Sequence, residues 1–385
     1  MTTTKRPKDR KATILAVSAE LFADRGFVAV GIDDIAARVG VTGPAIYRHF
    51  ESKDALFAAV LEGAMSDFAS ALEGATNDPS YTLESVVQAI ASRIADNPEA
   101  ITAYLHERWR LDRPSPSMLE AERCVHLVWG SAVAKHQPDL EKLRVEVRQR
   151  ALVGALAFGA RYHRGVSRSR LDELFVASGV AIMNAEQRLA NPGPDSSPVP
   201  RWRPADTRRD AILHAALALF RARGVRDVGI DEIGVAAGIS GPTVYYYFKN
   251  KAQVVLDAFD QAGGRVAAGV TDALSAAISP TDALERLIRS YVTIATDSVD
   301  LNVLTSREGD AILSGELKRF RRRGRAIRDG WASVVQEVRP DLTESEARLL
   351  VRMVFPLMQH AAEAAEGHGN LTEELVGIAT AHLIM

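Results

Sequence analysis

The chain has 385 residues, of which 47% are hydrophobic and 25% charged, an ordinary globular composition whose length allows two or three domains. Its single cysteine, Cys124, excludes an internal disulfide and a CxxC metal site, so we expect a cytoplasmic protein that binds no metal. The uncharged apolar run over residues 151–160 is too short to cross a bilayer, and we expect no membrane partner.

Charge is distributed unevenly along the chain, although the total is only −2. Residues 1–55 carry a net charge of +2 and residues 199–255 a net charge of +4, so the remainder is acidic. Two short basic segments attached to a larger acidic part are typical of nucleic-acid-binding modules joined to other domains.

Two predicted helices and a tight turn come first in the chain. Apolar residues recur at a helical period over residues 14–22, and Gly26 can end that helix. A second helix is predicted over residues 32–39. Gly40 can then take the left-handed conformation of a tight turn, and the hydroxyl of Thr42 can cap the helix that follows.

The third helix is short and has an apolar inner face. Ile46 and Phe50 lie four residues apart and point inward, and Pro44 suits the first helical turn. Small, hydroxylated and basic residues on its outer face are of the kind that fits the major groove of DNA. The outward residues are Thr42, Pro44, Ala45, Tyr47, Arg48 and His49.

Amphipathic stretches predict helices throughout the next part of the chain, and no period-two alternation indicates strands. These stretches cover about 53–73, 82–95, 99–111, 117–134, 139–163 and 170–189. Residues 191–204 then include five prolines, which cannot continue a helix. We expect an extended spacer there, with a reach of about 40 Å.

After the spacer the pattern repeats. Residues 14–53 align without gaps on residues 212–251, and 17 of the 40 positions are identical. The match extends to Trp129 and Trp331, so the chain contains two copies of a unit of about 190 residues. We refer to them as the first and second repeats. The expected domains are heads over 1–55 and 208–253, helical bodies over 56–190 and 254–385, and a linker over 191–207.

The second body is also predicted to be helical, which makes the fold all-α. Its amphipathic stretches cover about 251–275, 281–298, 301–313, 315–337, 343–366 and 371–384. The strongly basic stretch 318–325 has no counterpart in the first repeat. It is either a solvated helix face, a site for a phosphate-bearing effector such as an acyl-CoA, or an additional contact to the DNA backbone.

The head motif resembles the tetracycline-repressor (TetR) family of transcription regulators, whose signature is this three-helix head with Tyr-x-x-Phe and a following lysine. The matching residues are Tyr47, Phe50 and Lys53 in the first repeat and Tyr245, Phe248 and Lys251 in the second. The resemblance implies a ligand-responsive repressor that binds double-stranded operator DNA. The tandem form resembles a small actinobacterial subgroup that includes regulators of lipid-uptake operons, which implies control of lipid or other hydrophobic-compound metabolism.

The resemblance assigns the outward residues of both short helices to DNA. Besides those given above it implies contacts by Lys53 and by Ser240, Pro242, Thr243, Tyr245, Tyr246, Tyr247 and Lys251. Basic arms precede both heads, namely Arg6, Lys8, Arg10 and Lys11, and Arg201, Arg203, Arg208 and Arg209; they either reach the DNA or are merely solvated. Because Ala45, Arg48 and His49 are replaced by Thr, Tyr and Tyr in the second repeat, we expect a non-palindromic operator.

Members of the family respond to small molecules, which implies an apolar pocket for a hydrophobic effector, lipid-like or an acyl-CoA. The candidate lining residues are Tyr104, Trp109, Trp129, Phe158 and Tyr162 in the first body and Tyr291, Trp331, Met353, Phe355 and Met358 in the second. Each of them is alternatively a core residue.

Family members pair through the last two helices of their bodies. The spacer raises the effective concentration of one body for the other, so pairing within one chain is favoured over a homodimer of chains. The sequence contains no GxSxG, HExxH, P-loop, GxGxxG or CxxC motif, and we expect neither an enzyme nor a cofactor. The remaining alternative is a protein-interaction scaffold whose DNA-binding heads are degenerate.

Overall fold

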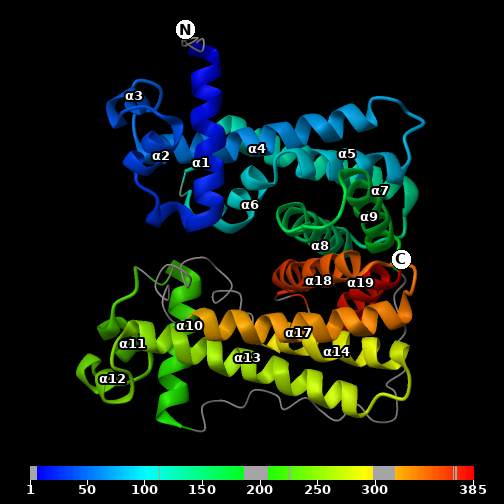
Figure 1. Cartoon of the computed structure of the whole chain (residues 1–385). Coiled ribbons are helices and arrows are strands. Elements are labelled where there is room, and N and C mark those ends of the chain that lie inside the picture. The colour runs from blue at the N-terminus through cyan, green and yellow to red at the C-terminus, as the bar shows by residue number, and fades with distance from the viewer. Residues whose placement is uncertain are drawn as a thin grey trace. The chain divides into compact units, whose positions relative to one another are not determined.

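The computed structural model describes residues 7–185 except 112, residues 207–297 except 224 and 226, and residues 317–385 except 367, 369 and 370. Every regular element within these ranges is a helix (Figure 1), so the predicted all-α fold is confirmed. The chain forms two compact units, residues 1–145 with 156–180 and residues 146–155 with 181–385. The second unit therefore contains short segments of the first repeat as well as the whole second repeat.

The first head consists of α1 (Pro7–Ala29), α2 (Ile32–Val39) and α3 (Gly43–Tyr47). As expected, the regular helix ends at Gly26, whose backbone is non-helical with φ 73° and ψ 161°, and after this kink a short helical segment completes α1. The cause is a distant carboxylate: an oxygen of Glu107 accepts the Phe27 N–H at 3.2 Å. A Cβ at Gly26 would lie 2.9 Å from that same carboxylate, so both the conformation and the space require glycine.

The first body continues from the head through a long core helix. Its elements are α4 (Lys53–Thr76), α5 (Leu83–Asp96), α6 (Pro98–Glu107), a 3-10 turn (Arg108–Arg110), α7 (Pro116–His136), α8 (Lys142–Arg161) and α9 (Arg168–Met183). Helix α4 has the length and apolar composition of a membrane-spanning helix, but half of its most apolar window is buried. Phe57, Leu61 and Phe68 lie inside the unit, where α4 packs against α5, α6 and α7.

The second repeat has the same order of elements. They are α10 (Arg208–Arg223), α11 (Ile230–Ala236), α12 (Gly241–Tyr247), α13 (Lys251–Ser275), α14 (Pro280–Asp297), α17 (Leu317–Val338), α18 (Glu344–Ala365) and α19 (Thr372–Ile384). Helices α14, α17 and α18 pack against one another, and α19 packs against α14 and α18 (Figure 1). The predicted spacer over 191–204 and the predicted helix over 301–313 lie outside the described residues.

A buried histidine connects the last two helices. His382 on α19 is fully buried, and its Nε2–H donates to the carbonyl oxygen of Leu350 on α18 at 3.0 Å. Burial disfavours the imidazolium and lowers the pKa of His382 from 6.5 to about 4. His214 on α10 is partly buried and its pKa is also lowered to about 4, for the same reason.

These histidines predict that the protein loses stability in weak acid. Between pH 6.5 and 4 the unfolded chain protonates His382 while the folded chain does not, so the free energy of unfolding falls with pH, by up to about 3 kcal/mol for this residue. Urea unfolding at pH 7 and pH 5 measures the effect. His382→Gln, which keeps an N–H donor, should flatten the pH dependence, whereas the exposed His126→Gln should not. Identical pH dependence in His382→Gln and the unaltered protein would contradict the assignment.

Candidate nucleic-acid interface

Both heads contain the same helix-turn-helix geometry. In the first, Gly40 has φ 75° and ψ 41°, and the next amide, of Val41, donates to the carbonyl of Ala36 at 2.9 Å. In the second, Gly238 has φ 70° and the amide of Ile239 donates to the carbonyl of Gly234 at 2.9 Å. The left-handed glycine predicted at Gly40 is confirmed, and the turn sets α3 and α12 in the same way on their preceding helices.

A second constraint in each turn was not predicted from the sequence. The aspartate near the start of the preceding helix packs against the first residue of the short helix. A Cβ on Gly43 would lie 2.9 Å from Oδ1 of Asp33, and one on Gly241 would lie 1.7 Å from Oδ1 of Asp231. Both the aspartate and the glycine recur in the two repeats, which is the signal that could have identified this contact.

The second head is packed more closely than the first at this point. Gly234 stands where the first repeat has Ala36, and a Cβ on it would lie 2.9 Å from the backbone nitrogen of Gly241. The backbones of α11 and α12 therefore approach each other too closely for any side chain between them. The second head depends on a pair of glycines where the first tolerates an alanine.

The short helices bury their predicted inner faces and expose most of their predicted outer faces. Ile46, Phe50, Val244 and Phe248 are buried. Tyr47 is 51% exposed, Tyr245 56% and Tyr246 85%, unusually high values for aromatic side chains. The other exposed positions are Thr42, Pro44, Arg48, Ser240, Pro242 and Thr243, whereas Ala45, His49 and Tyr247 are half-buried.

The hydroxyls at the starts of these helices do not cap them. Thr42 occupies the N-cap position of α3, but its side chain makes no capping hydrogen bond, so the expected cap is wrong. Ser240 holds the same position in α12, and its hydroxyl is hydrogen-bonded instead to that of Thr243 at 2.7 Å. These hydroxyls therefore lie on the exposed face.

A surface groove runs beside α3. It is bordered by the first residues of α2, the start of α3 and the first residue of α4, with both carboxylates of α2 among its lining. The lining residues are Gly31, Ile32, Asp33, Asp34, Ala37, Gly43, Pro44, Tyr47 and Lys53. The groove places Tyr47 and Pro44 on one continuous surface with the lysine of the family signature.

The signature lysines contact their own heads. The Nζ atom of Lys53 lies 4.1 Å from the centre of the Phe27 ring, a cation–π contact, and Nζ of Lys251 donates to the carbonyl oxygen of Val228 at 2.9 Å. Lys53 thus connects the start of α4 to the end of α1, and Lys251 connects the start of α13 to the turn before α11. Their contact with phosphate stays a prediction.

The residues of the basic arms that lie nearest the heads also contact the aromatic side chains of the heads. Lys11 lies over the ring of Phe50 at 5.5 Å, and Arg209, its counterpart, lies over Phe248 at 4.3 Å. Arg209 in addition forms an ion pair with Asp257. Arg6, Arg201 and Arg203 lie outside the described residues, and the side chain of Lys8 is not among those described.

The candidate pocket residues of the first body do not form one aromatic cluster in the described contacts. The hydroxyl of Tyr104 donates to Glu122 at 2.8 Å, while Phe158 stacks on Tyr162 with ring centres 4.5 Å apart. Trp129 is buried, Tyr162 is 39% exposed, and the side chain of Trp109 is not among those described.

In the second body three of the candidates lie together. The ring of Phe355 lies 4.8 Å from that of Tyr291 and 5.3 Å from that of Trp331. Met353 and Met358 are fully buried. The aromatic cluster of Tyr291, Trp331 and Phe355 lies where α14, α17 and α18 pack against one another.

The glycine contacts predict that the same glycine-to-alanine substitution destabilises the two heads by different amounts. Gly241→Ala must displace Asp231 and should destabilise the second head by about 1–3 kcal/mol, more than Gly43→Ala destabilises the first. Amide hydrogen exchange over residues 208–250 and 10–50 measures each head separately. Gly264→Ala, in α13 with no atom near the added Cβ, is the control and should not accelerate exchange. Equal acceleration in both heads would contradict the unequal packing.

Comparison with known proteins places these heads among characterised ones. The pattern of "Bacterial regulatory proteins, tetR family" matches residues 14–60 and 212–258. The chain is 47% identical over 57 residues to the transcriptional activator FasR of Mycolicibacterium smegmatis, covering 14% of this chain and 26% of FasR. It is 34% identical over 117 residues to the regulator EthR of the same organism, covering 30% of this chain and 52% of EthR.

A third relative is the repressor KstR2 of Rhodococcus jostii, 36% identical over 58 residues, covering 15% of this chain and 28% of KstR2. The matched parts therefore span between 26% and 52% of these curated relatives. The family pattern occurs twice, once on each helix-turn-helix head. Both helix-turn-helix heads therefore match the TetR family of bacterial regulatory proteins, and the family pattern occurs in tandem along the chain.

Proposed function

We propose that the protein is a transcriptional regulator that binds operator DNA with both heads and acts as a repressor in the cytoplasm. The observation that carries this proposal is the exposed tyrosine in each short helix, Tyr47 and Tyr245, held by the same left-handed turn. An aromatic side chain more than half exposed on a short helix gains nothing for the fold, but its hydroxyl and ring can contact phosphate and base edges. The intact helix-turn-helix geometry of both heads is evidence against a protein-interaction scaffold with degenerate heads.

The two heads are proposed to read different half-sites. At three outward positions α3 has Ala45, Arg48 and His49, whereas α12 has threonine, tyrosine and tyrosine. Arginine pairs best with guanine in the major groove, whereas tyrosine presents a single hydroxyl and a large apolar ring. The operator would therefore be non-palindromic.

Exchanging the outward residues tests this proposal. The variant Ala45→Thr/Arg48→Tyr/His49→Tyr makes the two helices alike at these positions and should shift preference toward a symmetric operator. Each lost bidentate contact corresponds to about 1–3 kcal/mol of discrimination, so the native site should be bound at least about tenfold more weakly. Selection from random duplexes, followed by footprinting, measures the preference. A symmetric site selected by the unaltered chain would refute the proposed asymmetry.

We also propose that the two bodies pair within one chain. Support comes from a buried ion pair inside the second unit, between Arg148 of α8 and Glu374 of α19, with Nε and Oε1 2.7 Å apart. Both side chains are at most 4% exposed. The remaining donors of Arg148 reach the carbonyl oxygens of Met183 at 2.5 Å and Ala185 at 2.7 Å. A buried guanidinium with so complete a set of partners is a specific contact between segments of different repeats.

The reciprocal ion pair, between the corresponding residues of the other repeat, cannot form. In the register that aligns Trp129 with Trp331, Leu350 takes the place of Arg148. Asp172, which corresponds to Glu374 in the same register, is half-buried and paired with its neighbour Arg168 at 2.9 Å. Two second bodies facing each other would bury Glu374 against leucine, without a cation. The pairing of unlike bodies is therefore favoured.

Removing one partner of this ion pair should lower the free energy of unfolding strongly, whereas replacing both partners should lower it only slightly. Arg148→Met leaves Glu374 buried alone and should destabilise the protein by about 3–5 kcal/mol, while Arg148→Met/Glu374→Leu should recover most of that loss. Urea unfolding provides the values, and Arg150→Met, which breaks the surface pair with Glu146, is the matched control.

Sedimentation of the unaltered chain tests the pairing itself. A species of 41.8 kDa that binds one duplex is expected. A species of twice that mass would contradict pairing within one chain. Contacts to phosphate are strongest at low salt, so the absence of any DNA complex at low salt would favour the scaffold with degenerate heads.

Ligand responsiveness is the last part of the proposal. The bodies would bind a small hydrophobic effector, and the head would follow through contacts inside the first unit. Glu107 of α6 binds the Phe27 amide, and Arg161 at the end of α8 forms an ion pair with Asp24 of α1. Both contacts link a helix of the body to the helix on which the head is built.

A further inference from the structure

We propose that the basic segment near the start of α17, residues 318–328, is a further DNA-binding surface that contacts the phosphate backbone beside the half-site of the second head. This inference deepens the proposed function and rests on it, because it requires that the second head binds operator DNA. It assigns the surface to the second repeat alone and names its partner, the backbone of the duplex.

The basic segment concentrates positive charge that the protein itself does not neutralise. Residues 318–328 include seven arginines and lysines and no acidic residue, in a chain whose net charge is −2. Arg322 and Arg325 lie one turn apart on α17, and both side chains are exposed. Neither of them forms an ion pair or a hydrogen bond with another described residue. Neighbouring like charges on a helix repel each other, and a polyanion bound to them would offset that repulsion.

A series of contacts within the second unit connects the basic segment to the second head. Arg209 of α10 donates to the carbonyl oxygen of Tyr247, at the end of α12, and forms an ion pair with Asp257 of α13. Asp260 lies one turn further along α13 and forms an ion pair with Arg323 of the basic segment, with Oδ1 and Nη1 3.3 Å apart. Two carboxylates on one helix therefore hold the basic arm of the second head and the basic segment of α17 close to each other.

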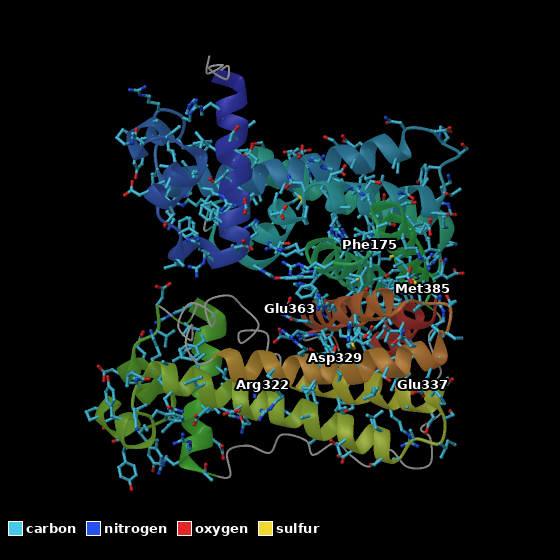
Figure 2. All side chains as sticks on the ribbon, in the orientation of Figure 1. Phe175, Arg322, Asp329, Glu337, Glu363 and Met385 are labelled. Atoms are coloured by element: carbon cyan, nitrogen blue, oxygen red, sulfur yellow. The ribbon has the colours of Figure 1, made fainter. Side chains whose placement is uncertain are left out.

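The distance of the basic segment from the head suits contact with DNA that flanks the half-site. Figure 2 shows Arg322 in the first turns of α17, which packs against α13. Asp260, which holds the segment, follows Lys251 by nine residues on α13, a rise of about 14 Å. Exposed arginines at this level would reach flanking phosphates where the duplex curves toward the second body, and the added contacts would offset the free energy of bending. Contacts of this kind hold the protein on the duplex without reading its sequence.

The first repeat lacks this surface. In the register that aligns the two bodies, Glu120 of α7 corresponds to Arg322, and Arg123 corresponds to Arg325. These two residues of the first repeat form an ion pair with each other, so their charges cancel. A cluster of cations that the shared fold required would occur in both repeats. The DNA-binding surface is therefore assigned to the second repeat.

The salt dependence of DNA affinity reports the number of phosphate contacts and tests the proposal. The full chain is titrated with its selected operator, extended by flanking DNA, at several salt concentrations. Arg322→Gln/Arg325→Gln removes two proposed contacts, so the slope of log affinity against log salt should become less steep by about 1.8. At low salt the affinity should fall about tenfold or more, equally for the operator and for an unrelated duplex, because backbone contacts carry no sequence information. Arg322→Lys/Arg325→Lys keeps both charges and should keep the slope.

The matched control is Lys142→Gln/Arg164→Gln, which removes two exposed cations of the first body and should leave the slope unchanged. An equal change of slope in the control and in Arg322→Gln/Arg325→Gln would overturn the proposal, because it would show a general effect of net charge. An unchanged slope in Arg322→Gln/Arg325→Gln would also overturn it, and would indicate a solvated helix face or a site for a small phosphate-bearing ligand. Absence of DNA binding by the unaltered chain would refute the proposed function itself, and this inference with it.

Discussion

The position of the first head depends on one buried carboxylate. Glu107 is 6% exposed and accepts the amide of Phe27 directly after the kink at Gly26, while Arg110 binds its other oxygen at 2.5 Å. A buried carboxylate cannot give up its donors without a large loss of free energy, so α6 and the end of α1 must move together. The direction of α3 follows from that of α1 through the head core. The body also contacts α1 through the ion pair of Arg161 with Asp24 and through packing of α4 and α6, so a change in the body can reach the head of this repeat.

Local features of the heads were predictable from the sequence because they depend on residues close in the chain. The turn at Gly40, the buried Ile46 and the second copy of the whole motif follow from short-range patterns and from the repeat. The interruption of the helix at Gly26 was predicted, but the short helical segment after it and the contact with Glu107, 81 residues further on, were not, because they depend on residues far apart in the chain. The contacts of Lys53 and Arg209 with aromatic rings were missed for the same reason.

Fusion of two repeats removes a constraint that symmetric dimers obey. In an isologous contact each residue appears on both sides, so a favourable Arg–Glu pair must occur twice. A chain with two repeats can place Arg148 on one side and Leu350 on the other, and can keep Arg328 in one body and His126 in the other. The heads share a framework: both keep the Asp–Gly packing and the left-handed turn, although Gly234 replaces Ala36 inside the second head and several outward side chains differ. Corresponding residues of the two repeats therefore differ where a symmetric dimer would have required them to be the same.

An asymmetric chain on an asymmetric operator has a defined direction. If the unlike bodies pair as proposed, the first head always occupies the half-site that suits Arg48 and His49, and the second head the other. A symmetric dimer gains no such orientation, because a half-turn of the protein gives the same complex. A ligand bound in one body would act on its own head directly and on the other head through the paired helices, so the buried contact of Arg148 and Glu374 would connect the two halves of the response.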